Sequence, residues 1–482
     1  QFSISKYFLF SFPSISIKIY EKRRIRKMKK STDLGKDKIP ILVLKLAVPS
    51  MIAQFVNVLY STVDRMFIGN IREIGDAALA GVGVCGPIVT LLTSFGTLIG
   101  LGGSILMAMR MGAGRKKQAE NILAHSFAML VVFSAFLTLL FLFVKRYLLN
   151  WFGASSATFP YADSYLTIYT AGTFFALMAV GLNYFITCQG FPGIGMLTVI
   201  IGAVTNIILD TVFIFGLHMN AAGAAAATVI AQFASCAFAF CFLRGKRVPI
   251  KITFIKRKNI SPMIIRSILT LGISPFLILA TDSVVIIVLN TVLQMYGGPG
   301  EGDALITCAT IVQSYMMLIT GPMLGISSGT QAILSYNYGA KKISRVKNAE
   351  KYILLLCLLF TTVMFLVSRT VPEYFIRIFT RDLNQMDLCI WGIQVFTLMI
   401  IPLSFQYVFV DGFTALGRSR TALFLSMFRK GDYILFTMIL PVFFGARSAF
   451  YAQPLADGIG AVMSLTAFLL IFNRHLKQRM PE

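Results

Sequence analysis

The stretch from Gly193 to Leu217 is apolar enough to cross a bilayer, yet it carries an amide and a carboxyl group at Asn206 and Asp210. A transmembrane helix needs about 20 mostly apolar residues, and an aspartate near its centre costs on the order of 3 kcal/mol. Residues four apart share one helix face, with Cβ atoms about 5–6 Å apart. The two side chains could therefore bind one small cation or share one proton. The alternative is a polar contact that holds two helices together.

The composition places the whole chain in a membrane. Of its 482 residues, 56% are hydrophobic and 13% are charged, whereas a soluble chain carries about 25% charged residues. The seven cysteines stand singly in apolar runs, which predicts neither a disulfide framework nor a zinc site. The net charge of +24 comes largely from short basic segments between apolar runs, so it indicates membrane topology and no nucleic-acid partner.

We expect an all-α integral membrane protein with twelve spans. The expected spans are residues 46–70, 83–109, 122–145, 161–188, 194–217, 221–243, 263–296, 304–336, 350–369, 385–415, 420–443 and 449–472. Basic segments occupy alternate connections, so the positive-inside rule places both termini in the cytoplasm of a multi-pass protein of the cell (plasma or inner) membrane. Four basic residues are exceptions on the opposite side: Lys145, Arg146, Arg377 and Arg381.

The two halves of the chain repeat. Gly112-Ala113, followed by basic residues, recurs at Gly339-Ala340, and Gly190 recurs at Gly417, both displaced by 227 positions. Six spans in each half predict two parallel six-helix bundles, related by a pseudo-twofold axis along the membrane normal, with a cavity between them. We expect a cytoplasmic N-terminal segment at 1–45, an N-lobe at 46–243, a cytoplasmic linker at 244–262, and a C-lobe with a short tail at 263–482.

Residues 1–27 lack an initial methionine and run from a short aromatic segment into a basic cluster. The apolar part is too short and too interrupted by serine and proline to span a bilayer. We interpret it as upstream sequence that is not part of the native protein, with Met28 as the start. The alternative is a signal-like or interfacial segment.

Helix geometry groups four polar residues at one depth. With a rise of about 1.5 Å per residue, Asp64 in the first span, Asn206 and Asp210 in the fifth, and Thr228 in the sixth converge in the outer half of the N-lobe. For Thr228 the alternative is a hydrogen bond to its own backbone, which is usual for threonine in transmembrane helices.

Several motifs in order resemble the multidrug and toxic compound extrusion (MATE) family of bacterial transporters over about residues 33–477. They are LAVPSMIAQFVNVLYSTVDRMFIGN, NIILDTVFIFGL, AAGAAAATVIAQ and GTQAILSYNYGAKK. The resemblance implies two six-helix lobes and export of organic cations and amphipathic drugs by proton or sodium antiport, with alternating access. It also implies an N-lobe cation site at Asp64, Asn206, Asp210 and Thr228, and a bending proline at Pro49. Thr211, Ala332 and Phe191 depart from the family pattern; Thr211 stands where many members have proline.

The second half has its own acids, at Asp282, Asp411, Asp432 and Asp457. Because Asp432 follows Arg429 by three residues, we expect those two side chains to form an ion pair. Asp282 is a candidate for a substrate cation or a second proton, so the expected substrate cavity includes Asp282, Arg429 and Asp432. Asp411 is expected to reach water near the cytoplasmic end of its span. The 22 methionines and 42 phenylalanines suit a cavity that accepts varied apolar cations, although most of them must face lipid or the core instead.

Two other functions compete with drug export. A lipid-linked oligosaccharide flippase of the same superfamily would line its cavity with several arginines, whereas Arg429 is nearly alone here. An integral-membrane enzyme is disfavoured because the chain has three histidines and neither a His-Glu-x-x-His motif nor a Walker A loop. We therefore expect a monomeric transporter in membrane lipid, with no metal or cofactor beyond the coupling ion.

The expected topology can be tested by labelling. A cysteine introduced near Lys117 or Arg247 should react with an impermeant thiol reagent from the cytoplasmic side alone, because both positions lie in basic connections. Labelling from outside in intact cells would overturn the topology.

Overall fold

The computed structural model describes residues 32–71, 74–152, 154–255, 260–298, 301–379, 382–472, 474 and 476. The expectations for residues 1–27 and for Met28 lie outside these ranges. The first half contains α2 (Ile39–Gly69), α3 (Gly75–Gly112), α4 (Lys116–Trp151), α5 (Phe159–Ala171), α6 (Thr173–Cys188), α7 (Pro192–Asp210), the π-helical turn η1 (Thr211–Gly216) and α8 (Asn220–Arg244). The second half contains α9 (Pro262–Gly297), α10 (Glu301–Gly339), α11 (Ile343–Thr370), α12 (Pro372–Ile376), α13 (Leu383–Phe396), α14 (Ile400–Ala415), α15 (Ser419–Phe444), η3 (Ala446–Tyr451), α16 (Ala452–Ala467) and η4 (Phe468–Phe472).

Helix lengths match the expected all-α membrane fold. In the described ranges nine helices are long and apolar enough to cross a membrane, and two bent pairs raise the number to eleven. The twelfth expected span is α15, 26 residues long, which carries Arg429, Lys430 and Asp432 within its apolar sequence. The helices α2 and α11 begin seven residues before the expected spans 46–70 and 350–369, because each helix continues from the apolar span into a polar flank.

The internal repeat is visible in the backbone. Helices α6 and α14 are displaced by 227 positions at both ends, and each is the second part of a bent pair, with bends of 56° and 49°. Left-handed residues recur at the same displacement: Gly190 (φ +87°) matches Gly417 (φ +81°), and Gly114 (φ +73°) matches Lys341 (φ +59°). The two halves therefore share one architecture, as the sequence motifs predicted.

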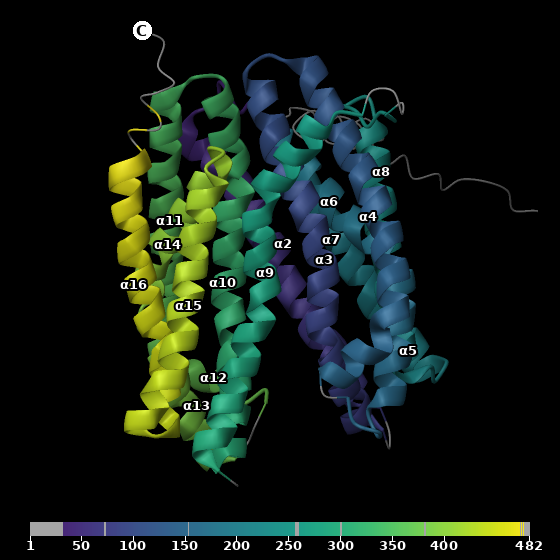
Figure 1. Ribbon diagram of the computed structural model, residues 1–482, viewed down its shortest axis with the longest axis vertical. Coiled ribbons are helices and arrows are strands. Elements are labelled where there is room, and N and C mark those ends of the chain that lie inside the picture. The colour runs from purple at the N-terminus through teal and green to yellow at the C-terminus, as the bar shows by residue number, and fades with distance from the viewer. Residues whose placement is uncertain are drawn as a thin grey trace, which may run out of the picture.

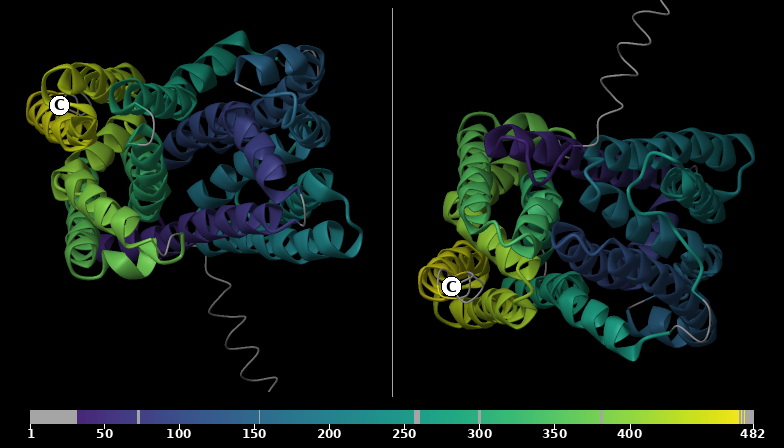
Figure 2. Two further views of the ribbon diagram at one scale, coloured as in Figure 1. Left: turned by 90° about the horizontal axis from the view of Figure 1, so that it is seen from below. Right: turned by 90° about the horizontal axis from the view of Figure 1, so that it is seen from above.

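The halves form two lobes that lie side by side, α2 to α8 in one and α9 to η4 in the other (Figures 1 and 2). They meet where α2 packs on α10 and α3 packs on α9. Glycines bring the backbones together: a Cβ atom on Gly272 would lie 1.8 Å from the carbonyl oxygen of Leu98, and one on Gly339 would lie 2.0 Å from that of Met109. Such distances leave no room for any side chain.

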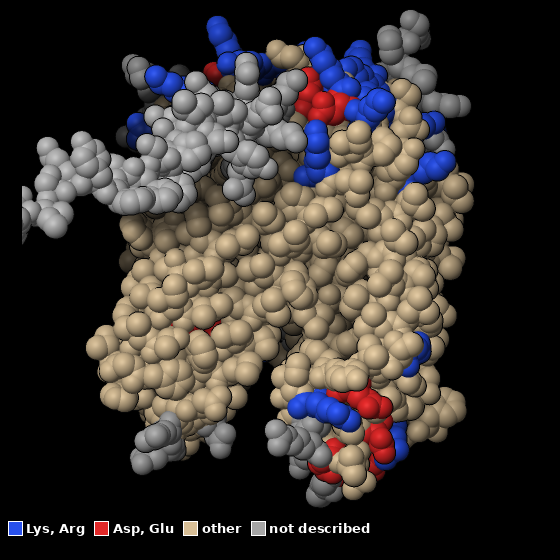
Figure 3. Space-filling view, turned by 180° about the vertical axis from the view of Figure 1, so that it is seen from behind, with Lys and Arg blue, Asp and Glu red and all other residues tan. Residues whose placement is uncertain are grey.

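Charge distinguishes the two ends of the molecule. Lysines and arginines gather at one end, called the basic end here, and a hollow separates the lobes at the other (Figure 3). The basic end includes Arg115, Lys116, Lys117, Lys341 and Lys342. Two exceptions to the charge bias are paired at the opposite end, Lys145 with Asp163 at 2.8 Å and Arg377 with Glu373 at 3.7 Å. Asp163 and Glu373 therefore offset the positive charge of these two exceptions.

At the basic end, each lobe forms hydrogen bonds with the residues that precede the first helix of the other lobe. The Asn337 amide donates to the Leu34 carbonyl at 2.9 Å, and Lys342 donates to the Gly35 carbonyl at 2.8 Å. In the other direction, the Ser261 backbone N–H donates to Nε2 of His125 at 2.9 Å. These bonds tie α10 to the start of α2, and α4 to the start of α9.

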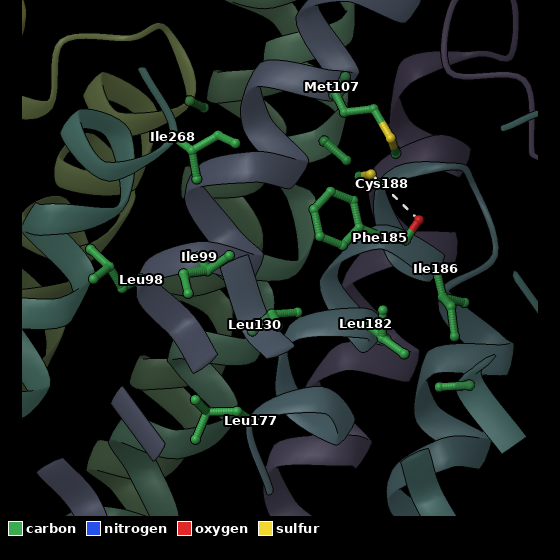
Figure 4. Close-up of a cluster of buried hydrophobic side chains, with 14 of the residues drawn as sticks. Leu98, Ile99, Met107, Leu130, Leu177, Leu182, Phe185, Ile186, Cys188 and Ile268 are labelled. Atoms are coloured by element: carbon green, nitrogen blue, oxygen red, sulfur yellow. Dashed lines mark hydrogen bonds between the residues drawn. The ribbon is translucent and has the colours of Figure 1, made fainter. Parts of the chain in front are cut away.

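The N-lobe core extends to the second lobe near the basic end. Buried side chains of α3, α4 and α6 surround Phe185, and Ile268 of α9 lies beside Leu98 and Ile99 of α3 (Figure 4). Because the same apolar cluster includes residues of both lobes, this end of the interface excludes water.

The glycine contact predicts a position-specific stability effect. Gly272→Ala should lower the free energy of unfolding by about 1–3 kcal/mol, because the new Cβ must push α9 away from α3. Gly86→Ala on α3 is the matched control, since a Cβ there meets no atom within 4 Å and alanine favours the helix by up to about 1 kcal/mol. Thermal unfolding in detergent measures both changes. Equal midpoints for the two variants would contradict the close approach.

Candidate functional site

Two carboxyl groups face each other between α2 and α7. Asp210 is the last residue of α7 and is completely buried, whereas Asp64 of α2 is half-buried. The side chains lie close enough to interact directly. Neither oxygen of Asp210 has a hydrogen-bond donor in the described ranges, and Oδ1 of Asp64 has none either. A proton or a small cation between the carboxyl groups would relieve their repulsion.

The other two expected residues adjoin this pair. Asn206 lies one helical turn before Asp210 and donates from Nδ2 to Oγ1 of Thr228 at 3.3 Å. The Thr228 hydroxyl in turn donates to the Ala224 carbonyl at 2.9 Å, so the alternative interpretation of a threonine bonded to its own backbone also holds. Oδ1 of Asn206 has no partner among the described residues. The structure thus brings the four residues together, and their role in cation coupling stays a prediction.

Two tyrosines also belong to the site. Tyr60 lies one turn before Asp64 on α2 and interacts electrostatically with both aspartates, and Tyr165 of α5 interacts with Asp64. Sequence reasoning missed both. The four-residue spacing from Tyr60 to Asp64 was a usable signal, because it places the two on one helix face.

The helix changes its winding directly after Asp210. The π-helical turn η1 spans Thr211–Gly216, and the Thr211 hydroxyl donates to the Ile207 carbonyl at 3.0 Å. A π-turn inside an α-helix is rare and is frequent at functional sites. Thr211, which departs from the family pattern, therefore caps the α-helical part without the break that a proline would impose.

A cavity of about 450 Å³ lies next to the acidic pair, mainly within the N-lobe. Its lining includes Asn206 and Thr228 of the site, Tyr60 of α2, and Tyr184 of α6, and α10 closes it from the other lobe with Gln331. No Lys, Arg, Asp or Glu of the described chain lines it. A guest in this cavity therefore meets hydroxyl, phenol and amide groups.

Methionine and phenylalanine contribute little to the lining of this cavity, which agrees with the expectation that most of them lie elsewhere. Met196 is the single methionine among the described lining residues, and phenylalanine is absent from them. Phenylalanines instead lie on the outer surface, as Phe143 and Phe136 do with exposures of 84% and 59%, or pack in the core.

The prediction of an ion pair between Arg429 and Asp432 is wrong. Arg429 binds Asp457 of α16 at 2.8 Å, and the fully buried Asp457 accepts a second bond from Gln453 at 2.8 Å. Oδ2 of Asp432 has no partner in the part of the chain described. Arg429 points across to the neighbouring helix because a completely buried carboxylate gains more from the charge than Asp432 does.

Asp282 is paired rather than free. Nζ of Lys430 lies 2.7 Å from its carboxylate, and the same ammonium donates to Thr281 at 2.8 Å and to the Ile278 carbonyl. Sequence reasoning missed Lys430, whose partners lie on α9. Asp282, Arg429 and Asp432 do not line the N-lobe cavity; their part in a substrate cavity stays a prediction.

The structure also bears on the expectations for Asp411 and Pro49. Asp411 does not simply reach water: it is half-buried and accepts a hydrogen bond from Ser327 of α10 at 2.5 Å. Pro49 lies inside α2, which continues as one helix from Ile39 to Gly69. The role of Pro49 in bending stays a prediction.

The chain is similar to multidrug export proteins and to solved structures of MATE transporters. The family model described as MatE matches residues 49–212 and 279–439. The multidrug export protein MepA of Staphylococcus saprophyticus is 24% identical over 435 residues, covering 90% of this chain and 94% of that protein. A solved outward-facing structure of a multidrug resistance MATE family transporter has a TM-score of 0.85 at 23% identity, covering 93% of this chain and 99% of the other. A MATE crystal structure in the straight conformation has a TM-score of 0.84, also at 23% identity, covering 93% and 100%.

The ion pair to Asp457 predicts an asymmetric pair of variants. Arg429→Met should lower the free energy of unfolding by about 3–5 kcal/mol, because it leaves a buried carboxylate unpaired. Asp432→Asn should change it by less than about 1 kcal/mol, since the charge it removes forms no ion pair with any described residue. Chemical or thermal unfolding in detergent compares them. A larger loss in Asp432→Asn would restore the pairing that the sequence suggested.

Proposed function

Because this chain belongs to the MatE family, we propose that it is a secondary active multidrug efflux transporter that exports organic cations and amphipathic drugs by proton or sodium antiport. The supporting observation is the facing pair of Asp64 and Asp210, next to a cavity whose lining includes Asn206 and Thr228. Carboxylates inside a membrane protein are costly and mark ion or proton pathways. We also propose that the protein works as a monomer in the cell membrane with both termini in the cytoplasm.

The coupling follows from the charge of the pair. When both carboxyl groups are ionised and empty, they repel each other across the interface of α2 and α7. A bound proton or sodium ion removes the repulsion and lets the two helices close together. Substrate and ion then weaken each other's binding by the same factor if they prefer different conformations of the N-lobe, as linkage requires.

In an alternating-access mechanism the cavity opens to one side of the membrane at a time, and the contacts between the lobes indicate which side is open here. The lobes are in backbone contact near the basic end and are separated at the other end (Figure 3). If the basic end is cytoplasmic, as the positive-inside rule predicts, this conformation faces outward. Gly272 and Gly339 then close the cytoplasmic half, and the interface must part there when the transporter turns inward.

The cavity favours drug export over lipid-linked oligosaccharide transport. A diphosphate requires several positive charges, and none of the described lining residues is Arg or Lys. The phenol rings of Tyr60 and Tyr184 instead suit an organic cation, since an aromatic face attracts positive charge. The amide groups of Asn57 and Gln54 add hydrogen bonds that fix its orientation.

Transport by reconstituted vesicles tests the proposal. Wild-type protein should drive a fluorescent organic cation against its gradient when either a proton gradient or a sodium gradient is imposed. Asp64→Asn and Asp210→Asn should each abolish gradient-driven transport, because neither amide can gain or lose a proton and neither carries the charge that attracts sodium. Binding of the fluorescent cation, measured without a gradient, should persist at least in part.

The matched control is Glu373→Gln, which removes an exposed carboxylate at the end opposite the basic end and should transport at the wild-type rate. The proposed coupling fails if both aspartate variants still transport against a gradient at that rate.

A further inference from the structure

A glutamate that sequence reasoning placed at the edge of a span is buried in the C-lobe. Glu350, on the second turn of α11, is 2% exposed, and neither of its carboxyl oxygens has a hydrogen-bond partner in the described ranges. The carboxyl group rests directly on the backbone of α14, where a Cβ on Gly412 would lie 2.3 Å from Oε1. The glycine therefore makes the space that this side chain occupies.

A second carboxyl group adjoins it. Asp411, the residue before Gly412, interacts electrostatically with Glu350 and accepts the hydrogen bond from Ser327. Gln331 of α10 lies beside Asp411; it is 2% exposed, and neither atom of its amide has a hydrogen-bond partner in the described part. Gln331 also lines the N-lobe cavity, so this side chain lies between the cavity and Asp411.

No positive charge compensates the pair. No ion pair joins either acid to a Lys, Arg or His of the described chain. Arg345, the nearest arginine before Glu350 on α11, instead bonds Asn337 and the carbonyls of Leu34 and Asp37. The titratable groups that interact with the pair are tyrosine and cysteine: Tyr184 of α6, Tyr407 of α14 and Cys357 of α11.

We propose that Glu350 and Asp411 form a second proton-binding site, in which the buried pair carries one proton. A proton fits because it removes one of two neighbouring negative charges that have no cation partner in the described ranges, and it needs no further ligand. A metal ion fits poorly, since no group of three or more acidic, histidine or cysteine side chains suited to one occurs in the described residues. The site is separate from Asp64 and Asp210, which lie in the other lobe and in the opposite half of the molecule.

The position of the site links the proton to the lobe interface. Asp411 interacts with Tyr184 of the N-lobe, and the two residues are displaced by 227 positions, the period of the repeat. Two residues that the pseudo-twofold axis relates can be neighbours only if both lie near that axis, so Asp411 and Tyr184 lie where the lobes touch. Opening of the basic end would admit water to Asp411 and allow the proton to leave, so the bound proton stabilises the conformation closed at that end.

Distance measurements between the lobes test this site; the test rests on the alternating access proposed above but needs no transport. Spin labels are placed on Lys117→Cys and Ser344→Cys, exposed and equivalent positions at the basic end. Cys241, the exposed cysteine among the described ones, is replaced by serine. The background carries Asp64→Asn and Asp210→Asn, so that titration of the N-lobe pair cannot contribute.

In that background, the ratio of molecules open at the basic end to closed ones should rise with pH, by up to about tenfold per pH unit, the limit for one proton. The ratio rises with pH because the closed conformation is the one that binds the proton, so loss of the proton at high pH destabilises the closed conformation relative to the open one. Glu350→Gln and Asp411→Asn should each abolish the pH dependence; the two variants guard against a folding defect in either. Glu301→Gln, an exposed carboxylate paired with Arg447, should leave it unchanged.

A background ratio that does not change with pH would overturn the proposal. So would a pH dependence that survives both the Glu350 and the Asp411 substitutions. Either result would leave the function proposed for Asp64 and Asp210 standing, because that function is judged by transport in vesicles.

Discussion

Two carboxyl groups of like charge repel each other strongly where little water is present to screen them. The carboxyl groups of Asp64 and Asp210 come from different helices, so their repulsion acts directly on the packing of α2 against α7. The π-turn after Asp210 and the hydrogen bond from Asn206 to Thr228 fix one side of the pair. The other side, Asp64, stands on a long helix that also packs on the second lobe. A change of charge at one point can therefore reach the lobe interface.

The acidic side chains of the two lobes have different partners, although the lobes share one backbone architecture. In the C-lobe, Asp457 and Asp282 are paired with Arg429 and Lys430, which are neighbours on α15. These pairs join α9, α15 and α16 and leave the acids with compensated charge. In the N-lobe, Asp64 and Asp210 form no ion pair with a Lys, Arg or His of the described residues. The pseudo-symmetric scaffold thus carries an acidic pair without a basic partner in one half and helices joined by ion pairs in the other, apart from the carboxyl pair of α11 and α14.

The interface between the lobes depends on glycine rather than on charge. At Gly272 and Gly339 the backbones approach so closely that even a methyl group would clash, and the shared apolar cluster seals the contact near the basic end. Such a surface gains its stability from packing alone, so it can part and re-form without breaking ion pairs. The hydrogen bonds at Leu34 and Ser261 keep the first helix of each lobe attached to the other lobe.

Much of this architecture was readable from the sequence, because lipid imposes simple demands on a chain. Apolar runs long enough to cross a bilayer gave the spans, and motifs displaced by 227 positions gave the paired lobes. Asp64, Asn206, Asp210 and Thr228 could be grouped because helix rise converts residue number into depth. Each of these features depends on a local period or on a single dimension along the membrane normal.

Contacts within the membrane plane were decided by the tertiary structure. Sequence spacing paired Arg429 with Asp432, but the rotation of α15 against α16 gave it Asp457 instead. Glu350 looked like a residue at a span's edge, but its carboxyl group is buried against α14, where Gly412 leaves the space that it occupies. The cavity likewise took its tyrosine and amide lining from helices far apart in the chain. Composition cannot show which face of a helix turns inward, because that orientation depends on the shapes of all its neighbours at once.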